Sequence, residues 1–391
     1  MMNNDYQVVW RGYVGGSTGY DRASREYLLA IDRLGVDVKI EPMAQGSTIF
    51  TAEISQEQIS RLKELINKPY AQDKKKVLIY HAQPNGVKPL VEKNTFDKVI
   101  ILTVWETTKI PSNWLESSNE ADAVIIPTTQ NKDALSDSGV ISPIYVVPHG
   151  ADVNTYSPDN TVLPLANVQD SFNFLSVFQW QHRKAPEILL RAFWEEFTDK
   201  DNVSLVLKTY WGHNVSKEES RIIIKQIAGY KEHLGFSNTA PVYVSTSMFD
   251  DEDLKGLYVL GDVFVLPTRG EGVGLPYIES LSSGVPVIAT AWGGSMDFLT
   301  NENSFLVDYD LVSTDYGVEK GISPHFNNLF TPDMKWAEPN LESLKKEMRK
   351  AYENPQLVEA KGKAGRQQME QMTWDKSGEI LKEVIEEVCK Q

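Results

Sequence analysis

Several residue types and patterns are scarce in this 391-residue chain, and each scarcity excludes a class of protein. Cys389 is the only cysteine, so disulfides within the chain and cysteine-based zinc sites are excluded. The patterns GxxxxGK(S/T), HExxH and GxSxG do not occur, so nothing supports a P-loop, a zinc protease or a serine hydrolase. Basic residues are in deficit: 39 Lys and Arg stand against 54 Asp and Glu, which argues against nucleic acid as the main partner and gives no overall attraction to anionic lipid.

Long apolar runs are also missing. No stretch of about 18 apolar residues exists, so we expect no transmembrane segment. The opening residues, MMNNDYQVVWRGYVGG, lack a charged segment followed by an apolar run, so we expect no signal peptide. Together these features predict a cytoplasmic, soluble protein.

What is present is an ordinary globular composition, with 41% hydrophobic and 24% charged residues. A chain of this length is too long for one hydrophobic core, so we expect two domains. Short apolar runs alternate with amphipathic helical patterns from end to end. Because the apolar runs are continuous, they indicate parallel strands covered on both faces, and hence an α/β fold.

The order of these segments predicts two similar halves. Strands are expected at 7–12, 36–40, 77–82, 98–105, 123–128 and 144–150, and again at 172–178, 204–210, 241–246, 262–268, 285–291 and 304–308. Helices are expected at 24–34, 56–67, 130–138, 185–197, 216–234, 251–260 and 275–282, with a helical tail at 341–391. Residues 154–171 lack periodicity and are assigned as the linker, and 310–339 are expected to be irregular.

We therefore predict two doubly wound, Rossmann-like domains with parallel sheets that face each other across a cleft. The first is expected at 1–155 and the second at 172–370, and a C-terminal helix at 371–391 is expected to pack back on the first. Ligands of such domains bind at the carboxyl ends of the strands.

The most informative segment is RGEGVGLPYIES, which begins at Arg269. It is typical of a glycine-rich loop that leads into a helix near Leu275, where unpaired backbone N–H groups bind anions. Glu271 in the loop and Glu279 one turn into the helix can accept hydrogen bonds from hydroxyls. An anion beside a polyol is the chemistry of a sugar nucleotide. The plainer alternatives are a solvated surface turn for Glu271 and a helix-dipole role for Glu279.

This segment resembles the E-x7-E signature of the retaining, nucleotide-sugar-dependent glycosyltransferases of GT-B fold, family four type, also called glycosyl transferases group 1. Four further segments resemble the same family in the same order: VVPHGADVNTYSP from Val146, VFQWQHRKAPEILLRAF from Val177, GDVFVLPTRGEG from Gly261 and AWGGSMDFL from Ala291. The resemblance covers the second half well and the first half loosely. It implies a hexosyltransferase-type enzyme (EC 2.4) of carbohydrate biosynthesis that needs no cofactor and no metal.

The resemblance also implies roles for individual residues. Lys184 and Arg183 would neutralise the leaving diphosphate. The family usually has a second basic residue where this chain has Gln179. The alternative for Lys184 and Arg183 is an exposed basic pair with no such role. Glu271 would hold the transferred sugar, and Glu279 the ribose hydroxyls. The other donor-binding residues are expected to be Gly272, Val273, Gly274, Leu275, Gly16 and Thr246.

Two regions of the first half are harder to assign. The loop GGSTG from Gly15 resembles a phosphate-facing loop of the family, but a simple turn with Ser17 or Thr18 as the helix N-cap is equally consistent with it. Many family members carry a histidine near the reacting carbon, where this chain has Trp105.

Neighbouring residues could replace that histidine. Glu106 could handle a proton or bind the acceptor, and His81 could line the site. His149 could line the cleft or cap a strand. Trp105, His81 and His149 are therefore our acceptor or cleft candidates, with a core histidine as the alternative for His81.

We predict a retaining transferase that moves a sugar from a nucleotide diphosphate donor to a saccharide or small-molecule acceptor. Two alternatives stay open: a sugar-nucleotide epimerase or phosphorylase on the same fold, and a non-catalytic module that binds a nucleotide sugar. A nicotinamide dehydrogenase is disfavoured because Gly12, Gly15 and Gly16 do not form GxGxxG, although Glu41 ends the second strand. The acidic pairs in 251–253 and 308–310 are interpreted as structural.

Overall fold

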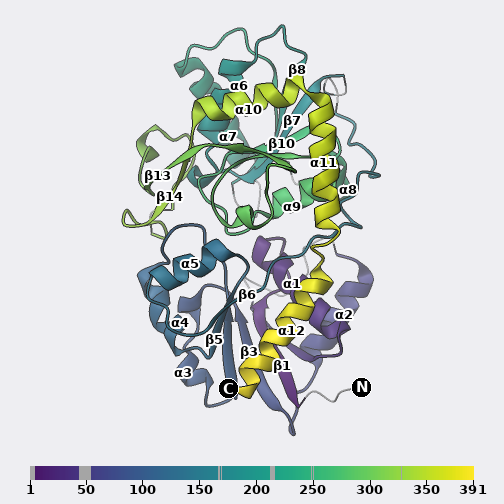
Figure 1. Cartoon of the computed structure of the whole chain (residues 1–391), viewed down its shortest axis with the longest axis vertical. Coiled ribbons are helices and arrows are strands. Elements are labelled where there is room, and N and C mark those ends of the chain that lie inside the picture. Colours follow the sequence, from purple (N-terminus) through teal and green to yellow (C-terminus); the bar gives the residue numbers. More distant parts are fainter. Residues whose placement is uncertain are drawn as a thin grey trace. The chain divides into compact units, whose positions relative to one another are not determined.

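The computed structural model describes residues 5–43, 54–165, 168, 170–211, 216–247, 249, 251–326 and 328–391. Residues 166, 167 and 169 of the expected linker lie outside this range. The chain divides into two compact units: Met1–Gly150 with Met372–Gln391, and Ala151–Gln371. Figure 1 labels their elements. No helix in the described residues combines the length and hydrophobicity needed to cross a bilayer.

The first unit contains a six-stranded parallel sheet in the order β2-β1-β3-β4-β5-β6. Its continuous apolar strands are buried, as expected for a sheet covered on both faces. The strands are β1 (Tyr6–Tyr13), β2 (Asp37–Met43), β3 (Lys75–His81), β4 (Lys98–Leu102), β5 (Ala123–Ile126) and β6 (Ile144–Val146). The helices are α1 (Gly19–Arg33), α2 (Gln56–Asn67), α3 (Pro89–Glu92), α4 (Leu115–Glu120), α5 (Thr129–Asp137) and α12 (Trp374–Lys390), with 3-10 turns η1 (Pro84–Gly86) and η2 (Ser112–Trp114).

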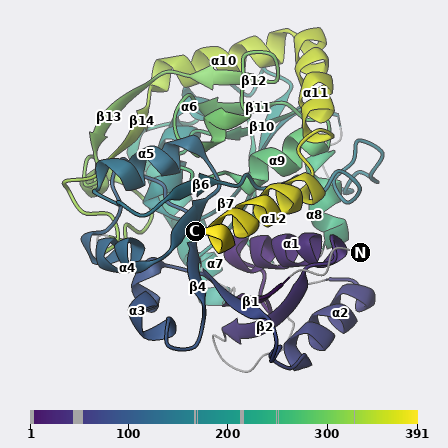
Figure 2. The ribbon, with the colours of Figure 1, turned by 60° about the horizontal axis from the view of Figure 1, so that its bottom comes forward.

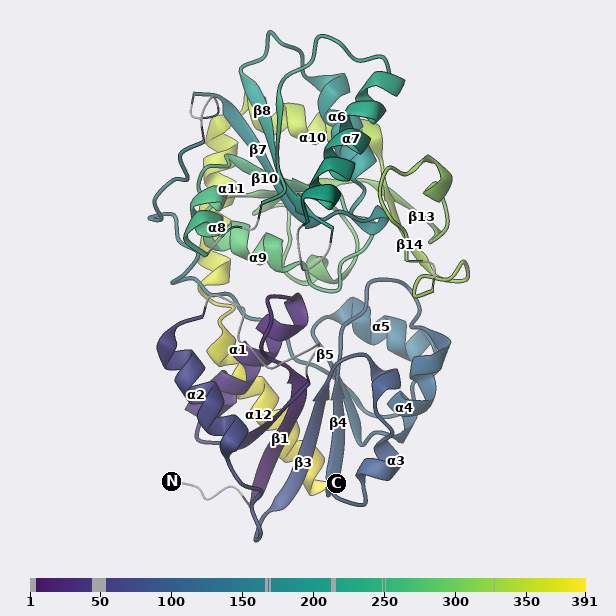
Figure 3. The ribbon, with the colours of Figure 1, turned by 180° about the vertical axis from the view of Figure 1, so that it is seen from behind.

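Helix α12 comes from the end of the chain and lies along α1 (Figure 2). In Figure 3, α12 lies on the far side of strands β1 and β3, so it covers one face of this sheet. The two helices approach closely because Gly378 has no side chain: a Cβ there would lie 2.6 Å from that of Ala30. The last helix of the chain thus completes the core of the first unit.

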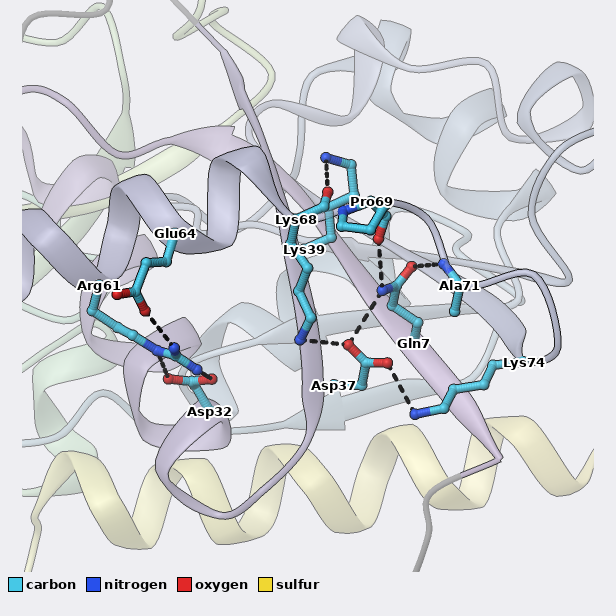
Figure 4. A network of polar contacts seen from close by, with 10 residues as sticks. All are labelled: Gln7, Asp32, Asp37, Lys39, Arg61, Glu64, Lys68, Pro69, Ala71 and Lys74. Atoms are coloured by element: carbon cyan, nitrogen blue, oxygen red, sulfur yellow. Dashed lines mark hydrogen bonds and ion pairs between the residues drawn. The ribbon is translucent and has the colours of Figure 1, made fainter.

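A polar network supports the edge strand β2 of the same sheet (Figure 4). The Asp37 carboxylate lies 2.6 Å from Lys68 Nζ and 2.9 Å from Lys74 Nζ, and it accepts a hydrogen bond from Gln7. Burial alone would raise the pKa of the Asp37 carboxyl, but the hydrogen bonds from the two lysines outweigh burial and lower the pKa. Lys39 donates to two backbone carbonyls at the end of α2, which joins this helix to β2.

The second unit contains another six-stranded parallel sheet, in the order β12-β11-β10-β7-β8-β9. Its strands are β7 (Phe172–Gln179), β8 (Val203–Tyr210), β9 (Val242–Ser245), β10 (Val263–Leu266), β11 (Val287–Thr290) and β12 (Ser304–Val307). The helices are α6 (Pro186–Glu196), α7 (Lys217–His233), α8 (Asp251–Tyr258), α9 (Leu275–Ser282), α10 (Leu341–Glu353) and α11 (Pro355–Met369), with 3-10 turns η3 (His182–Lys184), η4 (Gly294–Asp297) and η5 (Val318–Lys320).

Both sheets contain a topological switch point, the place where the chain changes its direction of travel across the sheet. In the first unit it lies between β1 and β3, and in the second between β7 and β10. Ligands of open α/β sheets bind outside the carboxyl ends of the strands at such a point. The predicted α/β class with two doubly wound parallel sheets is therefore confirmed.

The expectation that 310–339 are irregular is wrong at both ends of that segment. Strands β13 (Tyr309–Ser313) and β14 (Lys335–Pro339) form an antiparallel two-stranded sheet. Their sequences, YDLVS and KWAEP, are mixed in polarity, and the long connection between them gives no hairpin signal. Their pairing depends on backbone hydrogen bonds and on the burial of Trp336 and Ala337, which a sequence pattern does not reveal.

Candidate functional site

The candidate site lies at the switch point of the second unit, where two loops meet. Turn η3 follows β7, and the glycine-rich loop follows β10, the neighbouring strand. The backbone N–H of Arg269 donates to the carbonyl of Arg183 at 2.7 Å, and the Thr268 hydroxyl donates to the same oxygen at 2.9 Å. Segments separated by more than 80 residues are thus joined at one edge of the sheet.

Three predicted site residues converge there. The Glu271 carboxylate contacts Lys184 Nζ through one oxygen and lies 3.5 Å from Arg183 Nη1 through the other. The exposed fractions of Glu271 and Lys184 are only 6% and 7%. Burial would raise the pKa of the Glu271 carboxyl, but the charges of Lys184 and Arg183 outweigh burial and lower it. The carboxylate is therefore ionised, and an anionic ligand must compete with it for the two cations.

The backbone beside these cations is strained. Ala185, which ends turn η3, has φ 52° and ψ 47°, and it is the only non-glycine residue of positive φ in the described part of the chain. The left-handed conformation of a non-glycine residue costs roughly 1 kcal/mol or more. Ala185 is both the C-cap of η3, which contains Lys184, and the N-cap of α6, which begins at Pro186.

The glycine-rich loop delivers the start of α9 to the same edge. Gly274 is the N-cap at φ 89°, and no side chain caps this helix. A Cβ on Gly274 would lie 2.5 Å from the Tyr277 ring, so only glycine fits. The Tyr277 hydroxyl in turn donates to the carbonyl of Leu266 at 2.7 Å. Pro276 has no N–H, and the N–H of Tyr277 donates to the Gly274 carbonyl at 2.9 Å. Leu275 therefore provides the N–H that this helix start offers to an anion.

Glu279 lies one turn further along α9 and is 7% exposed. Its Oε2 accepts a hydrogen bond of 2.6 Å from the Tyr258 hydroxyl, which holds the carboxylate in place. Tyr210, the last residue of β8, connects the parts: burial raises the pKa of its phenol, and the charges of Glu279 and Glu271 raise it further, while Arg183 lowers it. The two glutamates and Arg183 therefore act on one common point.

The sequence analysis missed Arg269, which is 1% exposed. Its guanidinium donates to the carbonyl of His182, to Glu187 Oε1 at 2.6 Å, and to both carboxylate oxygens of Glu338 at 2.5 and 3.1 Å. Its carbonyl accepts from Ala337 N at 2.9 Å. Arg269 thus ties η3, α6 and β14 to the glycine-rich loop. Arg269 directly precedes the glycine-rich loop, which could have marked it as a site residue. The sequence does not show, however, that its side chain is buried.

Lys208 was also missed. It is 5% exposed, and burial lowers the pKa of its ammonium to about 8. The signal was present in the segment SLVLKTY, because a lysine interrupts an apolar strand that was expected to be covered on both faces.

The remaining donor-binding candidates fall into two units. Gly272, Val273 and Leu275 lie in or directly after the glycine-rich loop, and Thr246 directly follows β9. Gly16 belongs to the first unit.

Gly16 takes part in the cap of α1. Its N–H donates to Asp21 Oδ1 at 2.7 Å, and its carbonyl accepts from Arg25 at 2.6 Å. Thr18 is the N-cap of α1, in a capping box with Asp21. The contacts of Gly16 are thus those of a helix cap.

His81 lies at the end of β3, beside the switch point of the first unit. Its Nδ1 is 2.6 Å from the Ser24 hydroxyl, which accepts a hydrogen bond from the Trp10 indole. Burial, and to a smaller degree the charge of His149, lowers the pKa of His81 to about 3. The ring is therefore neutral at physiological pH and belongs to a buried hydrogen-bonded chain.

The other first-unit candidates differ in their surroundings. Trp105 is buried against Trp114, and its indole N–H donates to Thr107 and to the Lys109 carbonyl, so that N–H is used within the fold. His149 is buried between the rings of Tyr27 and Trp374. These contacts are those of core residues.

Glu106 is partly exposed. Burial raises the pKa of Tyr20, and the Glu106 charge adds to this effect, which places the carboxylate near the Tyr20 phenol. The centre of the Tyr20 ring lies 5.2 Å from that of His81, with the two rings tilted by 51°, so Glu106 and His81 are near the same tyrosine.

Residues 170–314 match the protein family described as Glycosyl transferases group 1. This segment of the chain is thus a glycosyl transferases group 1 segment. Four of the five motifs that predicted this family, those from Val177, Gly261, Arg269 and Ala291, lie within the matched segment. The matched segment contains every element of the second-unit site, from η3 to α9.

Two curated relatives align with parts of this chain. Sulfoquinovosyl transferase SQD2 of Arabidopsis thaliana is 37% identical over 84 residues, which are 22% of this chain and 16% of that protein. D-inositol 3-phosphate glycosyltransferase of Corynebacterium jeikeium is 27% identical over 188 residues, 45% of this chain and 42% of that protein. The alignments thus span less than half the length of either relative.

Among solved structures, Anabaena HepE in complex with UDP-glucose matches with a TM-score of 0.69 at 13% identity. The match covers 97% of this chain and 99% of that one. At this level of identity the likeness shows the fold, which is of GT-B class.

Proposed function

We propose that this chain is a retaining glycosyltransferase that uses a nucleotide diphosphate sugar. The observation that carries this proposal is the convergence of Arg183, Lys184 and Glu271 beside the uncapped start of α9, at the switch point of the second unit. The two cations and the adjoining helix start suit a diphosphate, and carboxylates suit hydroxyl groups. The match of residues 170–314 to the group 1 family supports the same activity. The UDP-glucose held by Anabaena HepE supports a sugar nucleotide as the donor.

In this proposal the second unit binds the donor. Arg183 and Lys184 hold the diphosphate, Glu279 accepts hydrogen bonds from the ribose hydroxyls, and Glu271 from hydroxyls of the sugar. The first unit presents the acceptor, a saccharide or small molecule. No metal is required, because the two cations carry the charge of the leaving group. Groups of three or more acidic, histidine or cysteine side chains suited to a metal are absent from the described residues.

The bond to break joins the anomeric carbon to the diphosphate oxygen, whose negative charge grows as the bond lengthens. Fixed cations that meet this charge lower the barrier, because they stabilise the transition state more than the ground state. The acceptor hydroxyl adds on the face that the diphosphate leaves, and its proton passes to the leaving oxygen. The ion pair of Lys184 with Glu271 gives this scheme a physical consequence: diphosphate binding must loosen that pair and turn Lys184 toward the ligand.

A panel of UDP-, GDP- and ADP-sugars tests the donor first. A donor at 100 times its Kd should raise the stability of the native state by about 2.7 kcal/mol, seen as a higher melting temperature. The matching donor is then incubated with acceptors, and release of nucleoside diphosphate is measured. An NMR spectrum of the product reports the anomeric configuration. Transfer with retention supports the proposal, inversion contradicts its stereochemistry, and binding without any release indicates a binding module.

Variants then test the residues. Glu279→Gln and Lys184→Met should each lower kcat about 100-fold or more, the cost of losing one preorganised charge or donor. Lys231→Met is the matched control, since Lys231 contacts Trp194 and Thr239 and lies outside the site. Because Lys184 belongs to a buried ion pair, its variant also needs a melting curve. Near-normal turnover in both folded variants would refute the assignment. An epimerase, the second candidate, would convert the donor without releasing nucleotide.

A further inference from the structure

Lys208 is a largely buried cation that lies between aromatic rings. Its Nζ lies 5.3 Å from the ring centres of both Tyr210 and Phe249. Among the residues that the structure describes, no carboxylate pairs with this ammonium and no acceptor forms a hydrogen bond with it. Burying most of an ammonium in this way is costly, because much of its hydration is lost and the two rings replace it only in part. A ligand atom that accepts a hydrogen bond would complete its surroundings.

The position of Lys208 links it to the candidate site. In the sheet, Lys208 of β8 is in register with Val177 of β7 and with Ser245, the last residue of β9. It is therefore near the carboxyl edge, where ligands of such sheets bind. Side chains two residues apart on a strand share a face, so Lys208 and Tyr210 lie on the same side. Tyr210 is the residue whose phenol is acted on by Glu279 and Glu271.

One part of the proposed donor, its base, has no binding residue assigned to it. In the proposed function the diphosphate belongs to Arg183 and Lys184, the sugar to Glu271 and the ribose to Glu279. The base is the one part without a residue. It is attached to the ribose, so it extends from Glu279 along the carboxyl edge, and Tyr210 connects Glu279 with Lys208 along that edge. The flanking rings exclude water, which strengthens a hydrogen bond from the ammonium.

We propose that Lys208 recognises the base of the donor nucleotide by donating a hydrogen bond to a carbonyl oxygen of the base ring. This inference rests on the proposed function. Uracil and guanine carry such carbonyl oxygens, whereas the acceptors of adenine are ring nitrogens, which lie at other positions of the base. A buried donor left without its acceptor penalises the wrong base, so Lys208 is a specificity-determining residue.

Calorimetric titration with UDP, GDP, ADP and inorganic pyrophosphate tests this inference. The wild-type protein should bind UDP or GDP at least about tenfold more tightly than ADP, the effect of one hydrogen bond to a charged group. Lys208→Met should weaken binding of the preferred nucleotide about 10- to 100-fold and leave ADP and pyrophosphate nearly unchanged. Lys231→Met, which removes another lysine that contacts a ring, should change none of the four.

Each other outcome has a definite meaning. If the wild-type protein prefers ADP, or if Lys208→Met keeps the base preference within a factor of about two, the inference is overturned while the donor site stands. Equal losses for all nucleotides and for pyrophosphate would place Lys208 at the phosphates instead, and also overturn it. If the wild-type protein binds none of the nucleotides, the proposed function fails and this inference fails with it.

Discussion

The buried ammonium of Lys208 should cost the protein stability, and replacing it should return that stability. Burial lowers the pKa of this group from its ordinary 10.5 to about 8. Since one pKa unit corresponds to 1.36 kcal/mol, a shift of this size is worth roughly 3 kcal/mol. The contacts with Tyr210 and Phe249 favour the charged form and offset part of this cost. We therefore expect Lys208→Met to stabilise the protein by about 1 to 3 kcal/mol at pH 7.

The dependence on pH separates this effect from changes in packing. The folded-state pKa lies below the unfolded-state value, so between pH 8 and 10.5 the unfolded chain binds more protons. Wild-type stability therefore gains from this group as pH rises through that window, while the cost is complete below pH 8. The advantage of Lys208→Met should be largest at pH 7 and shrink toward pH 10.5.

Urea unfolding at several pH values measures this difference, because all other titrating groups are shared by the two proteins. Lys231→Met is the control and should show no such trend. An advantage that does not change with pH would mean that the methionine acts through packing alone. A variant less stable than wild type at pH 7 would refute the view that the charge is a burden on the fold.

Three further predictions concern other parts of the molecule. Asp37→Asn should destabilise the protein at pH 7. Because the folded-state pKa of Asp37 is lowered, the difference from wild type should disappear as pH falls below the ordinary aspartate pKa near 3.8, and urea unfolding at several acidic pH values measures this. Arg269→Met should cost about 3–5 kcal/mol by leaving buried Glu187 and partly buried Glu338 unpaired, and a second change, Glu338→Gln, should restore part of the loss. A single variant as stable as wild type in urea would contradict this. Ala185→Gly should change stability by less than about 1 kcal/mol, because relief of the left-handed strain offsets the greater entropy of the unfolded chain. Ala192→Gly inside α6 should cost about 1 kcal/mol. Equal melting temperatures for the two variants would refute the claim that Ala185 is strained.

Much of the fold could be predicted because both sheets are parallel and buried. Continuous apolar runs mark such strands, and the bounds of helices 56–67 and 275–282 agree with α2 and α9. Some strand ends could not be predicted. The run at 98–105 continues to Trp105, but the strand ends at Leu102, because the N–H of Trp105 donates to the side chain of Asn131.

The candidate site was partly predictable for a related reason. Parallel strands end at one edge of a sheet, so residues after neighbouring strands meet, and the structure does bring Arg183, Lys184 and Glu271 together. The sequence could not show that Glu271 pairs with those cations, since the pairing depends on side-chain directions. Arg269 escaped notice for the same reason, because its partner Glu338 is 69 residues away.

The return of α12 to the first unit has a consequence for how this chain folds during synthesis. The second unit is one uninterrupted stretch, Ala151–Gln371, whereas the first needs both Met1–Gly150 and Met372–Gln391. A ribosome therefore releases every residue of the second unit before the first has its closing helix. Until then the apolar surface of α1 that awaits α12 is uncovered, and nascent chains stalled before residue 372 should depend on chaperones that shield it.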